Sequence, residues 1–459
     1  MPASAASDNS KSPKPYRTCV PRPPSQRDLR PEGDVCYTHL AADVAAPGLG
    51  YDHMNSNLWL VLGTATLFGL ATGIYEYVLP SYLKSQGISF ETMGLIFTLA
   101  GAAMVMVRIY MGGLSDLLGR KPLYGMALVV CGLGTASPAV VSGLLAQLLL
   151  KIVRDTAALT RETLFPIILY EERRGAFLNI ISKFRGVEFL VQAGGTLLAG
   201  AVIAAFALPT QGYRYALAIA GGALLLAAIG WALAFREHPR TATPTVMTLR
   251  ELFNFDLHPN LRIIMLAGGI LTFGIALSHS FYMPLFFPER FPDHAHLNPL
   301  LMSLHRVTIA LPMLVVGNLP IRNLRAWYCW GFVIEGVTMS ACALLPNFWA
   351  SAGTFLLHDL IGAGIWVPIQ ATLIQRFSRD ERRGVETGKV LAWTSLGAVV
   401  GPMVAGWLLK LGETTPALAE ASIIFPFFFS GVFMIIAAVP LLWLKLDAPT
   451  AAAVAEPAV

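Results

Sequence analysis

Residues 112–121 read Gly-Gly-Leu-Ser-Asp-Leu-Leu-Gly-Arg-Lys, a polar stretch between two long apolar runs. Asp116 stands four residues before Arg120, and Pro122 opens the next run. At that spacing the carboxylate can cap the following helix or pair with the guanidinium. The stretch therefore predicts a short connection between two membrane helices, with Asp116 stabilising the turn.

Composition places the whole chain in a lipid bilayer. Hydrophobic residues make up 55% of the 459 residues and charged residues 13%, and the mean hydropathy is +0.59. Membrane proteins collect Lys and Arg in cytoplasmic loops, so the net charge of +5 does not indicate a nucleic-acid partner. The five cysteines show no ligand spacing and predict neither a disulfide framework nor a cysteine metal site.

Apolar runs long enough to cross a bilayer as helices follow one another from Leu58 onward. We count twelve, near residues 58–82, 91–113, 122–141, 143–170, 177–207, 213–235, 262–286, 299–317, 326–345, 348–375, 386–410 and 421–444. The sequence therefore predicts an all-α membrane protein with twelve transmembrane helices.

Loop composition predicts the domain organisation and the orientation. Lys and Arg gather in one set of loops, which places both termini in the cytoplasm. The first residues are rich in Pro and polar side chains and predict disorder, and Met54 offers an alternative translation start. The predicted parts are an N-terminal tail (1–56), a six-helix half (57–235), a cytoplasmic linker (236–261), a second six-helix half (262–446) and a C-terminal tail (447–459).

A repeat relates the two halves. Glu-Arg-Arg-Gly occurs at 172–175, between the fourth and fifth spans, and again at 381–384, between the tenth and eleventh. The glycine pair Gly195 and Gly200 likewise matches Gly401 and Gly406. Pseudo-symmetric halves of this kind place a central site at their interface.

The motif at 112–121 and the two Arg-Arg-Gly signals resemble the Major Facilitator Superfamily. The resemblance covers about Asn57 to Leu446 and implies that the motif joins helices 2 and 3 on the cytoplasmic side and stabilises the outward-open state. It assigns that gating role to Gly112, Asp116, Gly119, Arg120 and Lys121. Leu117 stands where the family usually has a basic residue, and the corresponding loop of the second half has no Asp.

The fourth span carries five charged residues, although each costs about 2.5 to 3.5 kcal/mol at a helix centre unless it is paired or hydrated. At 100° per residue they share an arc of roughly 120°; they are Lys151, Arg154, Asp155, Arg161 and Glu162. In the family, helices 1, 4, 7 and 10 line the central cavity, so this face is expected to line it.

Charges in two neighbouring spans leave alternatives open. Arg185 and Glu188 in the fifth span can pair with Arg161 and Glu162, either as a static lock or as contacts that form and break during transport. Glu76 in the first span is the first candidate proton carrier. Its alternative role is a static pair with Lys151.

The second half supplies histidines and few charges. We expect cavity access for His279 in the seventh span and for His358 and Asp359 in the tenth, the two histidines as substrate ligands and Asp359 in proton coupling. Histidine with carboxylate can relay protons or bind a divalent transition metal, so a metal site stays open. The sequence does not decide the oligomeric state, and a monomer fits it.

Enzyme motifs and nucleotide-binding loops are absent from the sequence, which predicts neither an enzyme nor a cofactor. We expect a proton-coupled secondary transporter for a small polar or charged solute. The run from Gly73 to Pro80 and the charge-dense fourth span are similar to magnetosome-membrane transporters, which implies iron or an iron chelate as substrate and an inner or magnetosome membrane. The alternatives are a drug or metabolite efflux antiporter and a transport-inactive scaffold or sensor.

Overall fold

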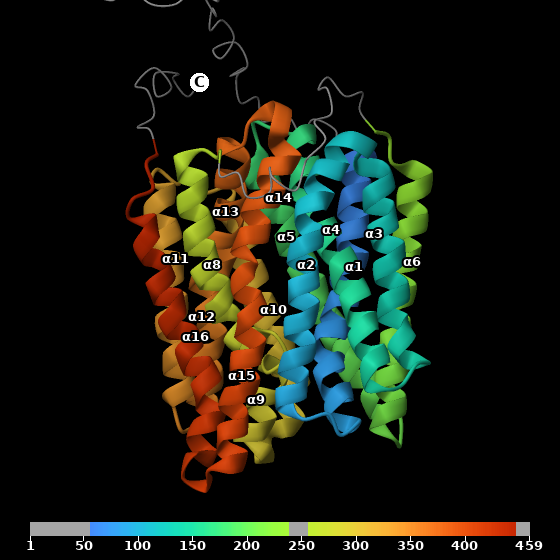
Figure 1. Cartoon of the computed structure of the whole chain (residues 1–459), viewed down its shortest axis with the longest axis vertical. Coiled ribbons are helices and arrows are strands. Elements are labelled where there is room, and N and C mark those ends of the chain that lie inside the picture. The colour runs from blue at the N-terminus through green and yellow to red at the C-terminus, as the bar shows by residue number, and fades with distance from the viewer. Residues whose placement is uncertain (1–55, 238–255, 447–459) are drawn as a thin grey trace, which may run out of the picture. The chain divides into compact units, whose positions relative to one another are not determined.

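The computed structural model describes residues 56–237 and 256–446, and every regular element in these ranges is helical (Figure 1). Met54, the predicted tails and most of the predicted linker lie outside the described residues. The expectations of a disordered N-terminal tail and of an alternative start therefore stay predictions.

The first half consists of six helices, which follow the apolar runs of the sequence. They are α1 (Ser56–Ser85), α2 (Phe90–Leu118), α3 (Arg120–Ala136), α4 (Leu144–Glu172), α5 (Phe177–Ala204) and α6 (Pro209–Ala234). Ser89 caps α2 by accepting a hydrogen bond from the Thr92 N–H. Gly119 adopts φ 108°, a value that favours glycine, and this lets α3 start directly after α2.

The second half has six spans, three of which are divided. The helices are α8 (Pro259–His279), α9 (Met283–Arg290), α10 (Asn298–Val316), α11 (Leu324–Leu344), α12 (Phe348–Ile361), α13 (Ala363–Phe377), α14 (Arg383–Thr394), α15 (Leu396–Thr414) and α16 (Ala419–Leu441). Short 3₁₀ turns lie at Ser137–Ala139, Pro292–Leu297, Asp380–Arg382 and Pro416–Leu418.

The divisions of these spans differ from the continuous helices that the sequence predicts. The seventh span breaks between His279 and Met283, where Pro284 cannot donate a backbone hydrogen bond to the preceding turn. The tenth breaks at Gly362, which stands so close to Glu335 of α11 that a Cβ would lie 2.8 Å from its Oε2. The eleventh breaks at Ser395, between α14 and α15.

Ten of the described spans are long and apolar enough to cross a membrane. The other two are α4, which carries five charged residues within its apolar sequence, and α11, which carries Arg325 and Glu335. Both run beside the ten (Figure 1). The chain is an all-helical membrane protein of twelve spans in two six-helix halves.

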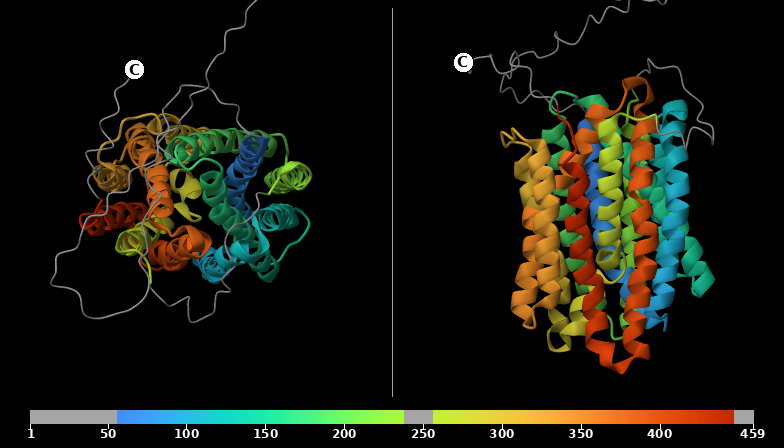
Figure 2. Two further views of the ribbon diagram at one scale, coloured as in Figure 1. Left: turned by 90° about the horizontal axis from the view of Figure 1, so that it is seen from above. Right: turned by 60° about the vertical axis from the view of Figure 1, so that its left-hand side comes forward.

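In each half the first span packs on the fifth and sixth spans, and the halves meet along two seams. In the first half α1 packs on α5 and α6; in the second α8 packs on α15 and α16. At one seam α5 packs against α10, and at the other α2 packs against α15. In the view from above in Figure 2 these two seams lie apart from each other.

The repeated glycines occupy equivalent places in this arrangement. Gly195 of α5 approaches Leu70 of α1, and Gly401 of α15 approaches Ala276 of α8. Gly200 and Gly406 face the opposite half, at Pro299 and at the Phe90 carbonyl respectively. The pseudo-symmetry seen in the sequence is therefore also a symmetry of packing.

Candidate functional site

A cavity of about 530 Å³ lies between the two halves. Its lining side chains come from α1, α2, α4, α5, α8, α10 and α15, with Met283 at the start of α9. On α1 they run from Phe68 to Pro80, the part of that helix far from the 112–121 motif. The cavity therefore extends from the middle of the bundle toward the end opposite the motif.

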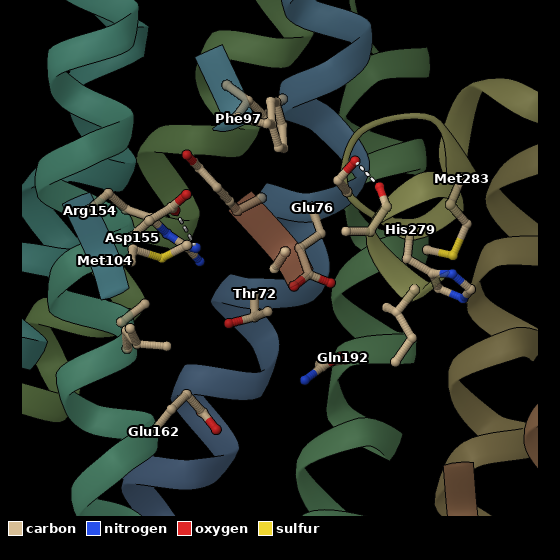
Figure 3. A pocket seen from close by; sticks show the side chains of 18 of the residues that line it. Thr72, Glu76, Phe97, Met104, Arg154, Asp155, Glu162, Gln192, His279 and Met283 are labelled. Atoms are coloured by element: carbon tan, nitrogen blue, oxygen red, sulfur yellow. Dashed lines mark hydrogen bonds and ion pairs between the residues drawn. The ribbon is translucent and has the colours of Figure 1, made fainter. Parts of the chain in front are cut away.

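The α4 wall of the cavity is charged and internally paired. Asp155 accepts hydrogen bonds from Lys151 Nζ at 2.6 Å and from Arg154 Nη1 at 3.0 Å. Lys151 also stands over the Phe97 ring at 3.7 Å, and the Arg154 guanidinium over Tyr75 at 3.9 Å. Figure 3 shows Arg154 and Asp155 on the same side of the cavity. Both cations are thus held by one carboxylate and two aromatic faces.

A four-residue network joins α4 to α5 deeper in the bundle. Arg161, whose side chain is 0% exposed, donates to Glu188 Oε1 at 2.9 Å and to Glu162 Oε1 at 2.6 Å. Arg185 pairs with both Glu162 and Glu188. Glu162, Arg185 and Glu188 line the cavity, whereas Arg161 lies behind them against Tyr124. The expected cross-pairs form, and Glu162 lines the cavity as expected, whereas Arg161 was also expected there and is hidden.

Glu76 projects into the middle of the cavity (Figure 3). Its carboxylate pairs with Arg306 of α10. The predicted alternative, a pair with Lys151, is wrong because Asp155 of the same helix already holds that ammonium. The Glu76 to Arg306 pair joins the first half to the second across the cavity. Arg306 was not among the predicted site residues; its position in an apolar span was the available signal.

Two of the three residues expected in the second-half wall are buried elsewhere. His279 lines the cavity, although its ring points away from Glu76 (Figure 3). His358 and Asp359 are 0% and 2% exposed and do not line the cavity, which corrects the expected access. They cluster with His305 of α10, because the turn of α12 that carries them packs against α10 rather than facing the first half. His305, His358 and Asp359 form the group of potential metal ligands in the described residues.

The motif residues close the other end of the bundle. Asp116 accepts from Arg120 at 2.9 Å, and Arg120 also donates to Glu171 at 2.8 Å. Asp116 Oδ2 further accepts from the backbone N–H of Val385, which belongs to the second half. Burial raises the pKa of Asp116, partly offset by Arg120. The Lys121 carbonyl accepts from Trp231 at 2.9 Å, and the surroundings of Gly112 lie outside what the structure describes.

The two Arg-Arg-Gly repeats meet at this same end. Arg174 of the first donates to Asp380, just before the second, at 2.9 Å. Partial burial raises the pKa of Asp380, but the guanidinium groups of Arg174 and Arg383 outweigh it and lower that pKa overall. Gly384 stands against the Asp116 carboxylate, where a Cβ would clash.

Other polar contacts between the halves complete the closure. Arg108 donates to Ser395 Oγ at 2.6 Å. The loop of the second half that lacks an Asp is also bound from the first half. Asn179 of α5 donates to the carbonyl of Gly317 in this loop at 3.2 Å and to the side chain of Asn318 at 2.5 Å. Neutral amides thus take the place that the carboxylate has in the first half.

Comparison with known proteins shows the family of this chain. The sequence profile of the Major Facilitator Superfamily matches residues 61–320 and 296–458. Among curated relatives, the class E tetracycline resistance protein of Escherichia coli is 24% identical over 79% of this chain and 90% of that protein, and multidrug resistance protein 2 of Bacillus subtilis (strain 168) is 22% identical over 80% and 90%. The niacin transporter NiaP of Acinetobacter baylyi is 26% identical, but the match spans only 36% of either chain.

Solved structures share the fold at low identity. The human organic anion transporter MFSD10 superposes with a TM-score of 0.66 at 15% identity, over 84% of this chain and 99% of that one. The proton:xylose symporter XylE gives 0.62 at 16% identity, over 86% and 97%. With its motif, repeat and twelve-helix architecture, the chain belongs to the Major Facilitator Superfamily and is a membrane transporter, not an enzyme.

Proposed function

We propose that the protein is a proton-coupled efflux antiporter for a drug-sized organic solute. The observation that carries the proposal is a cavity between the halves that is bridged by the ion pair of Glu76 with Arg306. Both curated relatives that align over most of the chain are named as resistance proteins, and this supports efflux over uptake.

The cavity suits an organic solute with a polar or charged group. A volume of about 530 Å³ falls within the range of about 300–1,000 Å³ that small-molecule sites occupy. Aromatic side chains such as Phe97, Tyr75 and Phe189 offer flat apolar contact, and the paired charges of α4 offer specific polar contacts. A bare metal ion would leave most of this space unfilled.

Proton coupling acts through the charge of Glu76. When ionised, Glu76 holds Arg306 of the opposite half; a proton on the carboxylate removes the ion pair and frees the halves to move. The Glu76 side chain is 44% exposed toward the cavity, so protons can reach it. An organic cation that takes the place of Arg306 at the Glu76 carboxylate would break the same ion pair that a proton breaks.

The basic loops support an orientation with the motif end in the cytoplasm. In that orientation the closed end faces the cytoplasm and the cavity lies in the outer half of an inner membrane. Alternating access then requires the contacts of Asp116, Arg174 and Asn179 with the second half to break.

Two alternatives remain as outcomes of the test. Iron or an iron chelate is a hypothesis from the magnetosome resemblance, and none of the relatives named above supports it. A transport-inactive scaffold or sensor is the other.

The test is a flux assay in proteoliposomes that contain a pH-sensitive dye. A proton gradient is imposed, and a tetracycline, a lipophilic cation, niacin and ferric citrate are added separately. We expect a solute-dependent proton flux with an organic compound, its loss in Glu76→Gln, and its retention in the control Glu413→Gln, an exposed carboxylate at the end opposite the motif. A response to ferric citrate alone would replace the organic solute by an iron chelate, and wild-type flux in Glu76→Gln would remove Glu76 from coupling.

A further inference from the structure

The cluster of His305, His358 and Asp359 lies behind the cavity wall, between α10 and α12. The three residues are 1%, 0% and 2% exposed. Their candidate ligand atoms all lie within 4.8 Å of one another. The cluster takes no part in the proposed coupling of Glu76 and Arg306.

Hydrogen bonding fixes which ring nitrogen of His358 can bind a ligand. Its Nδ1 contacts the backbone carbonyl of Phe355, which is an acceptor, so Nδ1 must carry the proton. Nε2 of a neutral ring then bears a lone pair, and it faces Asp359 Oδ2 at 3.2 Å. Two acceptors therefore face each other without a donor between them.

His305 directs a second nitrogen at the same oxygen. Its Nδ1 is in contact with Asp359 Oδ2. Within the described ranges, neither nitrogen of His305, nor His358 Nε2, nor Asp359 Oδ2 makes a hydrogen bond, although all are fully buried. Buried polar atoms are normally satisfied. The His358 Nε2 lone pair faces the Asp359 carboxylate, and His305 Nδ1 lies against the same oxygen, so the arrangement indicates a missing positive charge.

We propose that His305, His358 and Asp359 bind a divalent first-row transition metal ion of the Zn²⁺ type. Two imidazoles and one carboxylate are the donors that such ions prefer, and a Zn–N distance of about 2.0 Å in tetrahedral geometry separates ligand atoms by roughly 3.3 Å. The 3.2 Å between His358 Nε2 and Asp359 Oδ2 fits that separation. The bond from His358 Nδ1 to a backbone carbonyl is the outer contact that orients metal-binding histidines.

One cavity residue adjoins the site. His279 lines the cavity, and its ring centroid lies 5.6 Å from that of His358 and 5.8 Å from that of His305. In this proposal an ion enters from the cavity past the His279 ring. Once bound, it ties α10 to α12 and restrains Arg306, the residue after His305, in its contact with Glu76.

The test is metal binding by the full chain in lipid nanodiscs, purified without a polyhistidine tag. After dialysis against Zn²⁺ and then metal-free buffer, we expect one equivalent in the wild type and none in His305→Gln, His358→Gln or Asp359→Asn. The matched control is the double variant His294→Gln/His296→Gln, a His-x-His pair outside the cluster, which keeps the equivalent. Thermal unfolding of each protein checks that the variants fold.

A second measurement needs no variant of the cluster. X-ray absorption of the Zn²⁺-loaded wild type should show two imidazoles and oxygen at about 2.0 Å, and Co²⁺ should give the visible absorption of tetrahedral coordination. Less than one equivalent in the wild type, a first shell without imidazole, or loss of the metal in the His294 and His296 variant would each overturn the proposal. If the cluster binds only protons, the wild type will hold less than one equivalent of Zn²⁺, which is the first of these outcomes.

Discussion

At the scale of single residues, the charges of α4 remain in the membrane because each has a partner. Arg161 is the most buried of them, and Glu188 satisfies it with three charge-assisted hydrogen bonds, one at 2.9 Å and two at 3.2 Å. Removing one partner from a buried pair costs more than the pair contributes, because the other charge is left uncompensated. The penalty should therefore depend on how far solvent reaches the position of the removed carboxylate.

Glu188→Gln should destabilise the protein by about 3–5 kcal/mol, since it leaves Arg161 short of one negative charge in the bundle. Glu162→Gln should cost less, because Glu162 is 28% exposed whereas Glu188 is 1% exposed. Thermal unfolding in detergent or nanodiscs measures both. Equal losses for the two variants would show that exposure does not decide the penalty.

At the scale of helices, glycines set how closely the first and fifth spans approach. Gly195 packs against the backbone of Leu70, while its neighbour Gly194 has no atom within 4 Å of an added Cβ. The two positions are adjacent in sequence and differ only in which face of α5 they occupy. They form a matched pair for testing the α1 to α5 contact.

Gly195→Ala should destabilise the first half by about 1–3 kcal/mol, because its Cβ would meet a backbone carbonyl that cannot move away as a side chain can. Gly194→Ala should be neutral or slightly stabilising, since alanine is the better helix former. Unfolding transitions of the two variants, compared with that of the wild type, give the difference. A loss at Gly194 as large as that at Gly195 would contradict the close contact.

At the scale of the whole molecule, contacts between the halves flank the cavity on both sides. Asp116 and Arg174 bridge them at the motif end, while Lys84 pairs with Glu289 at the other. Alternating access requires one set to open while the other holds. Substitutions at the motif end should therefore change the distance between halves without affecting the folding of either.

Asp380→Asn should loosen the motif end at neutral pH, because it removes the negative charge that pairs with the Arg174 guanidinium. Spin labels at the exposed positions 176 and 376, on opposite halves, should show a longer mean distance than in the unsubstituted chain. Glu413→Gln is the control and should leave the distance unchanged.

The effect should depend on pH in one direction. The pKa of Asp380 is lowered in this conformer, so its contribution is present above the ordinary carboxyl range near pH 4 and is lost as the pH falls through the lowered value. The two proteins should therefore differ at about pH 7 and converge only when the pH falls below the lowered pKa of Asp380, which lies under the ordinary value of about 4. A difference that persists in acid would assign the closure to other contacts.

The sequence by itself determined the membrane class, the two halves, the motif pair of Asp116 with Arg120 and the charged face of α4. Each depends on hydropathy or on residues a few positions apart, and the chain geometry of a helix sets those relations locally. The tertiary structure decided the rest. Glu76 pairs with Arg306, which is 230 positions away. His358 packs beside His305 and does not line the cavity. Such choices depend on which helices pack together and at what depth, and no local pattern encodes that.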